Sequence, residues 1–140
     1  MSDKTTQLST GAARRNPIPH EANEQEALFR WAWFARGTHP ELDLLYHIPN
    51  GGSRNRLEAA NLKRQGVKSG VPDLCLPVAR GEYHGLYIEM KYGKNKTSES
   101  QNKWLSALQK QGYATAVCYG FEVARAVITK YLNLKGDIKI

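Results

Sequence analysis

The sequence predicts an α/β domain in which a small mixed β-sheet is flanked by helices. The chain has 140 residues, which fits one domain, and 41% of them are hydrophobic, which is enough for a buried core. Some segments carry apolar residues at helical spacing, whereas others are short apolar runs bounded by turn residues, as strands are. The predicted elements follow the order α-β-α-β-β-α-β-α, which favours a sheet with helices packed on it.

The first half of the chain predicts a helix, a strand and a second helix. Residues 20–35 have helical spacing, and the Gly-Thr-His-Pro segment at 37–40 ends this helix. Residues 41–48 are the first predicted strand, which leads into a Pro-Asn-Gly-Gly turn at 49–52, and residues 54–65 are the second helix. The predicted buried stripe of the first helix consists of Leu28, Trp31, Ala32 and Ala35.

A β-hairpin follows, and the functional interpretation depends on it. Residues 74–76 and 85–91 are the predicted strands, separated by a polar turn that contains Gly. Strand side chains alternate between the two faces of a sheet. One face of the second strand therefore carries Tyr87, Glu89 and Lys91, and the other carries Leu86, Ile88 and Met90. If the strands pair antiparallel, Asp73 and Glu89 converge, with Lys91 beside them.

The remainder of the chain predicts a helix, a strand and a last helix. The helix spans residues 99–111, with Ser98 as its N-cap and Gln101 at the N3 position of a capping box. Residues 113–119 are the predicted strand, and residues 122–132 are the last helix. The predicted inward side of that helix consists of Val123, Ala126, Val127 and Tyr131.

Asp73, Glu89 and Lys91 together suit one kind of chemistry. Two carboxylates on rigid strands can hold a hard divalent cation such as Mg²⁺, which takes oxygen ligands and keeps several waters. A neighbouring lysine can position a water whose pKa the metal lowers, help to deprotonate it, or steady charge on a phosphate. The pattern therefore indicates hydrolysis of a phosphodiester. The same spacing is also compatible with an ordinary hairpin that has an exposed Glu–Lys pair and an Asp in a turn.

The surrounding sequence resembles a nuclease superfamily. Pro72-Asp73, followed by a strand that ends in Glu89-Met-Lys91, resembles the PD-(D/E)xK nuclease core, and the fuller string resembles its VRR-NUC branch, especially small stand-alone phage and prophage members. The matching segments lie in order between about residues 21 and 132: HIPNGG at 47–52, GV at 66–67, GVPDL at 70–74, GLYIEMK at 85–91, S-x-x-Q at 98–101 and GY at 112–113. The resemblance implies a restriction-endonuclease-like core and a metal-dependent endonuclease that acts on DNA.

The resemblance also implies roles for the hairpin residues. Asp73 and Glu89 would bind Mg²⁺ or Mn²⁺, and the carbonyl of Met90 would be an additional ligand. Lys91 would handle the attacking water. Many family members have Leu at the position of Met90, and this conservative difference does not affect the expected role.

Two helices are expected to complete the site. Family members carry an acidic residue and a Gln one turn apart in the first helix, which matches Glu21 and Gln25 here. Glu21 is the first candidate for the additional site carboxylate and Glu24 the second. An alternative is that these glutamates only favour the positive end of the helix dipole. Gln101 would orient a water or a phosphate, although its capping role would also explain its presence.

The net charge of +7 suits a polyanionic partner, and nucleic acid is the expected one, although other classes of basic protein share this charge. The resemblance places the turn at 49–52 on the rim of the site. The helix at 54–65 is either a DNA-tracking surface or a solvated basic face. The candidate nucleic-acid contacts are His47, Asn50, Arg54, Arg56, Lys63, Arg64, Lys94 and Lys96.

Composition sets the expected domain boundaries and compartment. Residues 1–19 are predicted to be a flexible arm in which Arg14 and Arg15 can touch phosphate, residues 20–134 the nuclease domain, and residues 135–140 a tail. No run approaches the roughly 20 apolar residues of a membrane span, and no signal peptide is evident. The two cysteines lie in apolar strand-like runs, which favours buried reduced thiols and a cytoplasmic protein.

The expected partner is branched or otherwise structured DNA, such as a Holliday junction, a preference inferred from the family. A homodimer would place two active sites on one junction, since two-fold assembly is the commonest symmetry. No membrane partner and no small-molecule cofactor is expected. The main alternative is a nuclease-like fold that binds nucleic acid without cutting it, and the intact Asp73, Glu89 and Lys91 argue against it. A protein–protein adaptor is disfavoured by the basic charge and the acidic cluster.

Overall fold

A computed structural model describes residues 20–49 and 56–135 of the chain, without the side chains of His20 and Glu21. The predicted N-terminal arm, the contacts assigned to Asn50 and Arg54, and the tail beyond residue 135 lie outside these residues. In chain order the elements are α2 (His20–Ala35), the 3₁₀ helix η1 (Pro40–Leu44), β1 (Tyr46–His47), α3 (Arg56–Arg64), β2 (Leu74–Leu76), β3 (Leu86–Lys91), α4 (Glu99–Lys110), β4 (Ala114–Tyr119) and α5 (Phe121–Leu132).

The four strands form one mixed sheet in the order β1-β2-β3-β4. β1 pairs antiparallel with β2, β2 pairs antiparallel with β3, and β3 pairs parallel with β4. The antiparallel pairing of β2 with β3 is the pairing expected for the predicted β-hairpin. The parallel pair is joined through α4, as a parallel connection requires a crossover. The predicted α/β class with a small mixed sheet is confirmed.

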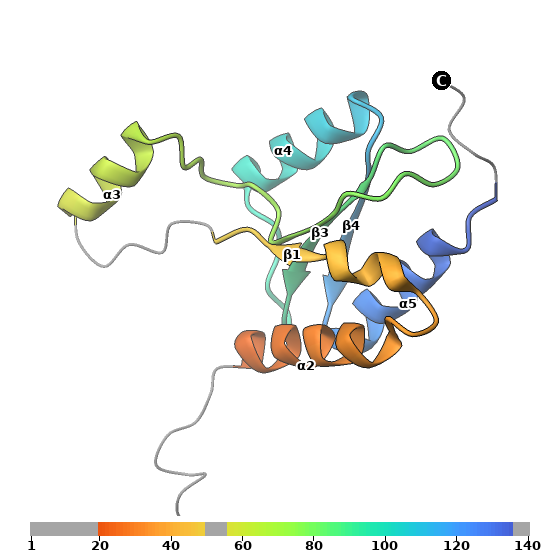
Figure 1. Cartoon of the computed structure of the whole chain (residues 1–140). Helices are drawn as coiled ribbons and strands as arrows, with labels where there is room; N and C mark the ends of the chain where they lie inside the picture. Colours follow the sequence, from red (N-terminus) through yellow and green to blue (C-terminus); the bar gives the residue numbers. More distant parts are fainter. Residues whose placement is uncertain (1–19, 50–55, 136–140) are drawn as a thin grey trace, which may run out of the picture.

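Helices cover both faces of the sheet. Figure 1 shows α2 and α5 on one side and α4 on the other, while α3 projects away from the body. The core lies between the sheet and the α2–α5 layer, and its fully buried side chains include Leu28, Leu74, Leu76, Ile88 and Ile128. No residue of α3 is buried. Within the described residues, no helix is long and apolar enough to cross a membrane.

The prediction of a strand across residues 41–48 was wrong for its first half. Pro40 to Leu44 form the 3₁₀ helix η1, and only Tyr46 and His47 are in a strand. Polar and apolar residues alternate at 41–44 as they do in a strand. Proline at the first helical position presets the backbone for a helical turn. Leu42 and Leu45, three residues apart, are both buried, which matches the three-residue repeat of a 3₁₀ helix.

The inward side predicted for the last helix was correct for two of its four residues: Tyr131 is buried and Val127 packs against the core, but Val123 and Ala126 are exposed. Val123 is 44% exposed, and the buried residues of α5 are Ala124, Ile128, Tyr131 and Leu132. Both stripes are apolar and both have helical spacing, so the sequence periodicity did not distinguish them. Contact with α2 and β4 selected the stripe one residue further along the chain. The stripe predicted for α2 was correct: Leu28 and Ala32 are buried, and Trp31 and Ala35 pack against the core.

Both cysteines are free thiols and both are buried, as predicted. Burial raises the pKa of Cys118 to about 11. Burial is also the main cause that raises the pKa of Tyr87 to about 12, and the neighbouring Cys75 adds to it. Cys118 and Tyr87 therefore stay protonated at neutral pH, so neither group supplies a base or a nucleophile there.

Candidate active site

The hairpin of β2 and β3 brings the two predicted carboxylates to one end of the sheet. The register pairs Leu74 with Ile88. Asp73, the residue before Leu74, and Glu89, the residue after Ile88, are the next positions along this antiparallel register. The Met90 backbone N–H donates a hydrogen bond of 2.7 Å to Asp73 Oδ2, which fixes the Asp73 carboxylate against β3.

Glu89 is buried, with only 2% of its surface exposed, and it has charged and polar partners. Gln101 Nε2 of α4 donates to Glu89 Oε2 at 3.0 Å, and Lys91 Nζ lies 3.8 Å from the same oxygen. An ionised carboxylate is stable in a buried position only when such partners compensate for its lost hydration. The arrangement brings Glu89, Lys91 and Gln101 together as the sequence predicted, and it is not an exposed surface pair.

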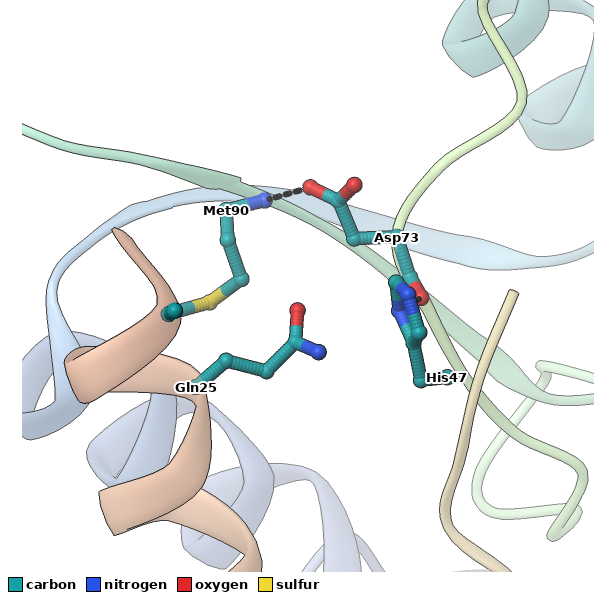
Figure 2. A pocket seen from close by; sticks show the side chains of 5 residues that line it. Gln25, His47, Asp73 and Met90 are labelled. Atoms are coloured by element: carbon teal, nitrogen blue, oxygen red, sulfur yellow. Dashed lines mark hydrogen bonds between the residues drawn. The ribbon is translucent and has the colours of Figure 1, made fainter. Parts of the chain in front are cut away.

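A pocket of about 250 Å³ opens beside Asp73, and it is lined by Ala22, Gln25, His47, Asp73 and Met90. Figure 2 shows the Gln25 carboxamide reaching from α2 toward Asp73 and His47. The pocket joins residues of α2, β1 and β3 and the residue that precedes β2. Helix α2, strand β1 and the start of β2 therefore form one wall of the site.

His47 contacts the backbone of the same aspartate. Its Nδ1 lies 2.9 Å from the Asp73 carbonyl oxygen, which also accepts a 2.7 Å hydrogen bond from the Ile48 N–H. A carbonyl oxygen only accepts, so Nδ1 carries the proton and the second ring nitrogen, Nε2, is left for other contacts. His47 was predicted as a substrate contact, and its position beside Asp73 is compatible with that role.

The two candidate glutamates of the first helix have different surroundings. Glu24 Oε1 accepts a 3.2 Å hydrogen bond from the Phe121 N–H, at the first residue of α5. The first N–H groups of a helix have no partner within it, so this carboxylate caps α5. The Glu24 carboxylate is therefore bound to the start of α5 and not to the segment around Asp73. The side chain of Glu21 lies outside the described atoms, and its role remains a prediction.

The loop before Asp73 packs closely against the first turn of α4. Gly70 has φ +90°, and a Cβ at this position would lie 2.6 Å from the carbonyl carbon and oxygen of Ser100. Only glycine fits there. The Ser69 hydroxyl lies 3.4 Å from the Ser100 hydroxyl. This packing links the segment that carries Asp73 to the helix that carries Gln101, so the two halves of the site are held together.

The predicted capping box of α4 is also present. The Gln101 N–H donates to Ser98 Oγ at 3.2 Å, and Gln101 Oε1 accepts from the Ser98 N–H at 2.8 Å. The capping role predicted for Gln101 is confirmed, whereas its role in orienting a water or a phosphate stays a prediction. Its amide oxygen caps the helix while its amide nitrogen holds Glu89.

The predicted basic contacts form two groups. Arg56, Lys63 and Arg64 lie on the projecting helix α3, and all three side chains are exposed. Lys94 and Lys96 lie in the loop between β3 and α4, next to the site, and are also exposed. Among the described residues, no carboxylate forms an ion pair with either lysine of this loop. Figure 1 shows α3 projecting away from the sheet, whereas the loop with Lys94 and Lys96 begins directly after Lys91.

The donor set of the site fits a hard divalent cation. Asp73 and Glu89 offer carboxylate oxygens, and Mg²⁺ is usually held by one or two carboxylates together with waters and substrate phosphate. In the described part of the chain, no cluster of three or more His, Cys, Asp or Glu side chains gathers, so no closed zinc-type site is present there. The chemistry of these donors is compatible with a cation such as Mg²⁺.

Sequence reasoning missed two contributors to the site. Gln25 was noted only for its spacing from Glu21, but its side chain lines the pocket. Gly70 was noted only as the first residue of the GVPDL segment, but it is the position at which the backbone of α4 approaches closely. The one-turn spacing of Glu21 and Gln25 was the available signal for the first. Nothing local signals the second, because its constraint comes from a helix 30 residues later.

Comparison with known proteins agrees with this geometry. The model of the VRR-NUC domain family matches residues 14–122. A solved structure described as a VRR_NUC domain protein is 34% identical in sequence and superposes with a TM-score of 0.73, and the match covers 89% of this chain and 96% of that chain. No curated protein matches this chain. The chain belongs to the VRR-NUC family of nuclease domains.

Proposed function

We propose that the chain is a Mg²⁺- or Mn²⁺-dependent endonuclease that hydrolyses phosphodiester bonds of branched or otherwise structured DNA. The observation that carries the proposal is the placement of Asp73 opposite Glu89, with Lys91 Nζ 3.8 Å from the Glu89 carboxylate. A buried carboxylate can hold a metal ion, and a lysine beside it can position the attacking water. Family membership and the net charge of +7 support a nucleic-acid substrate.

Asp73 and Glu89 would hold the metal ion, with the Met90 carbonyl and Glu21 as further ligands. The ion, when bound, lowers the pKa of a coordinated water and neutralises charge on the phosphate. The Met90 N–H keeps the Asp73 carboxylate in place, and Gln101 does the same for Glu89. Residues next to metal ligands commonly orient them in this way.

Lys91 would position the attacking water and help to deprotonate it during hydrolysis. Only 14% of its side chain is exposed, so the surrounding protein restricts its movement. Its position beside the Glu89 carboxylate keeps the ammonium group at the reacting phosphate. His47 and Gln25, which line the pocket beside Asp73, would contact the substrate phosphate.

We further propose that the protein acts as a homodimer in the cytoplasm. Two copies would present two sites to one junction, and two-fold assembly is the commonest symmetry. Trp33 and Phe34 on α2 are 59% and 77% exposed, and large exposed apolar side chains often mark protein interfaces. The two buried free thiols agree with a reducing compartment. A monomeric mass by light scattering, together with full activity, would refute the dimer.

The test is cleavage of labelled four-way junction, flap, single-stranded and linear duplex DNA, with Mg²⁺, Mn²⁺ or EDTA. Wild-type protein should nick the branched substrates only with metal, and Glu89→Ala should abolish cleavage. Glu82→Ala is the matched control, because Glu82 is an exposed glutamate in the turn at the opposite end of β3. Tight binding without cutting under every metal would overturn the proposal in favour of a non-catalytic binding module.

A further inference from the structure

The end of β4 places an exposed tyrosine beside the proposed catalytic lysine. The parallel register pairs Lys91, the last residue of β3, with Tyr119, the last residue of β4. Side chains paired in this way project from the same face of a sheet. Tyr119 is 45% exposed at the end of β4, which is an edge strand of the sheet.

The Tyr119 ring is held in place from its far end. Its hydroxyl donates a 2.7 Å hydrogen bond to the Asn95 carbonyl oxygen in the loop between β3 and α4. The hydroxyl therefore has a hydrogen-bond partner within the protein, and the side chain as a whole remains partly exposed. A ring fixed before binding loses little conformational freedom when a ligand stacks on it.

The loop that Tyr119 supports is a tight basic turn. The Asn95 N–H donates to the Tyr92 carbonyl oxygen at 3.2 Å, and Gly93 at the second position has φ +63°. This turn carries Lys94 at its tip, and Lys96 follows it. Both lysines are exposed. A fixed aromatic ring therefore lies next to two cations and next to Lys91.

We propose that Tyr119 and this basic turn bind an unpaired DNA nucleotide beside the scissile phosphate, with the base on the ring and the phosphates on Lys94 and Lys96. Proteins that bind single strands combine aromatic stacking with a basic track along the backbone in this way. The inference rests on the proposed nuclease function and narrows its substrate class. The favoured DNA has a single-stranded or unstacked nucleotide at the cut, as a flap or a distorted junction has and a linear duplex lacks.

Binding measurements in a Glu89→Ala background test the stacking surface without cleavage. Tyr119→Leu should weaken binding of a flap about 5- to 150-fold, the range expected for loss of one stacked base, and should leave a linear duplex of equal length unaffected. Tyr119→Phe should bind the flap within about twofold of the background, because it keeps the ring and loses only the loop tether. Tyr83→Leu is the matched control, since Tyr83 is 41% exposed in the turn before β3, at the opposite end of that strand.

A fluorescent base reports stacking directly. Flaps carrying 2-aminopurine at each of the first unpaired positions should show a fluorescence change on binding that Tyr119→Phe keeps and Tyr119→Leu loses. The proposal is overturned if Tyr119→Leu binds flap and duplex as the background does. It is equally overturned if Phe and Leu weaken binding alike, since the side chain would then only tether the loop.

The two proposals fail in different ways. Metal-dependent cleavage by wild-type protein, with no Tyr119 effect on binding or fluorescence, would remove the stacking surface and keep the nuclease. Absence of cleavage with every metal, with a Tyr119-dependent fluorescence change, would remove the nuclease and keep a surface that binds unpaired DNA.

Discussion

Gln101 and Glu89 are joined by a 3.0 Å hydrogen bond from the glutamine amide nitrogen to the buried carboxylate, while the other end of the same amide caps α4. One side chain therefore fixes both the start of a helix and the orientation of a proposed metal ligand. The consequence is that helix formation and site geometry depend on each other. A substitution that removes only one of the two hydrogen bonds can separate the effect on the helix from the effect on the site.

Gln101→Glu is such a change. A glutamate can still accept from the Ser98 N–H, so the melting temperature should stay near that of the wild type. It cannot donate to Glu89 and places a second negative charge beside it, so cleavage should fall about 10- to 100-fold, as is common for partners of metal ligands. Ser98→Ala is the control, because it loses the cap and keeps the donor. Equal cleavage rates for Gln101→Glu and wild type would show that the bond is only structural.

Lys91→Ala should lower the cleavage rate by about 10²- to 10⁴-fold, the range for loss of a proton-transfer group. DNA affinity should change only a few-fold, because the lysine acts in the chemical step. Single-turnover cleavage and binding in EDTA measure the two effects separately. Lys103→Ala is the control, since Lys103 is an exposed lysine of α4 that pairs with Glu99. Wild-type rates in Lys91→Ala would remove this residue from the mechanism.

Asp73→Asn should weaken Mn²⁺ binding at least about tenfold while the local fold is kept. The asparagine oxygen can still accept from the Met90 N–H, but it lacks the charge that attracts a cation. DNA affinity should be unchanged or higher, because a negative charge facing phosphate is removed. Titration calorimetry with Mn²⁺ measures the effect, and Asp43→Asn, at an exposed aspartate of η1, is the control. An unchanged titration would contradict the assignment of Asp73.

Gly70→Ala should displace the first turn of α4 and with it the Gln101–Glu89 bond. A Cβ here would lie 2.6 Å from the Ser100 backbone, in addition to the strain of a positive φ. Gly66→Ala is the matched control, because Gly66 has φ +101° but no atom within 4 Å of the added carbon. Thermal unfolding should show a loss of about 1–3 kcal/mol from strain alone in Gly66→Ala and a larger loss in Gly70→Ala. Cleavage by folded protein should fall only in Gly70→Ala, and equal effects of the two changes would refute the packing role.

The glutamates of α2 should separate by their effects. Glu24→Ala should cost about 1 kcal/mol of stability, because it removes the cap of α5, and should leave cleavage by folded protein unchanged. Glu21→Ala should leave stability unchanged and lower cleavage at least about tenfold, as expected for a ligand of the proposed site. Denaturant unfolding and cleavage assays on both variants decide the matter. The opposite pattern would make Glu24 the site carboxylate.

The sequence alone predicted the hairpin, whose proposed chemistry stays a prediction. Asp73 directly precedes β2, and Glu89 and Lys91 lie on β3, the next strand along the chain. Antiparallel pairing of such neighbouring strands and the two-residue alternation of their side chains follow from local rules. The capping box of α4 could also be predicted from the sequence, because its two residues are three positions apart. These features depend on contacts between near neighbours in the chain.

The tertiary structure decided between alternatives that the local sequence patterns did not resolve. The apolar residues of α5 form two stripes, and packing against α2 and β4 buried the one that contains Ala124 and Ile128. Glu24 was the second candidate for the site carboxylate after Glu21, and the tertiary structure shows that it accepts a hydrogen bond from the first N–H of α5 instead. The backbone of Ser100 lies so close to Gly70 that a larger residue does not fit there. The parallel pairing of β3 with β4 places Tyr119 beside Lys91. Each of these depends on elements distant in sequence, because burial and register are properties of the assembled fold.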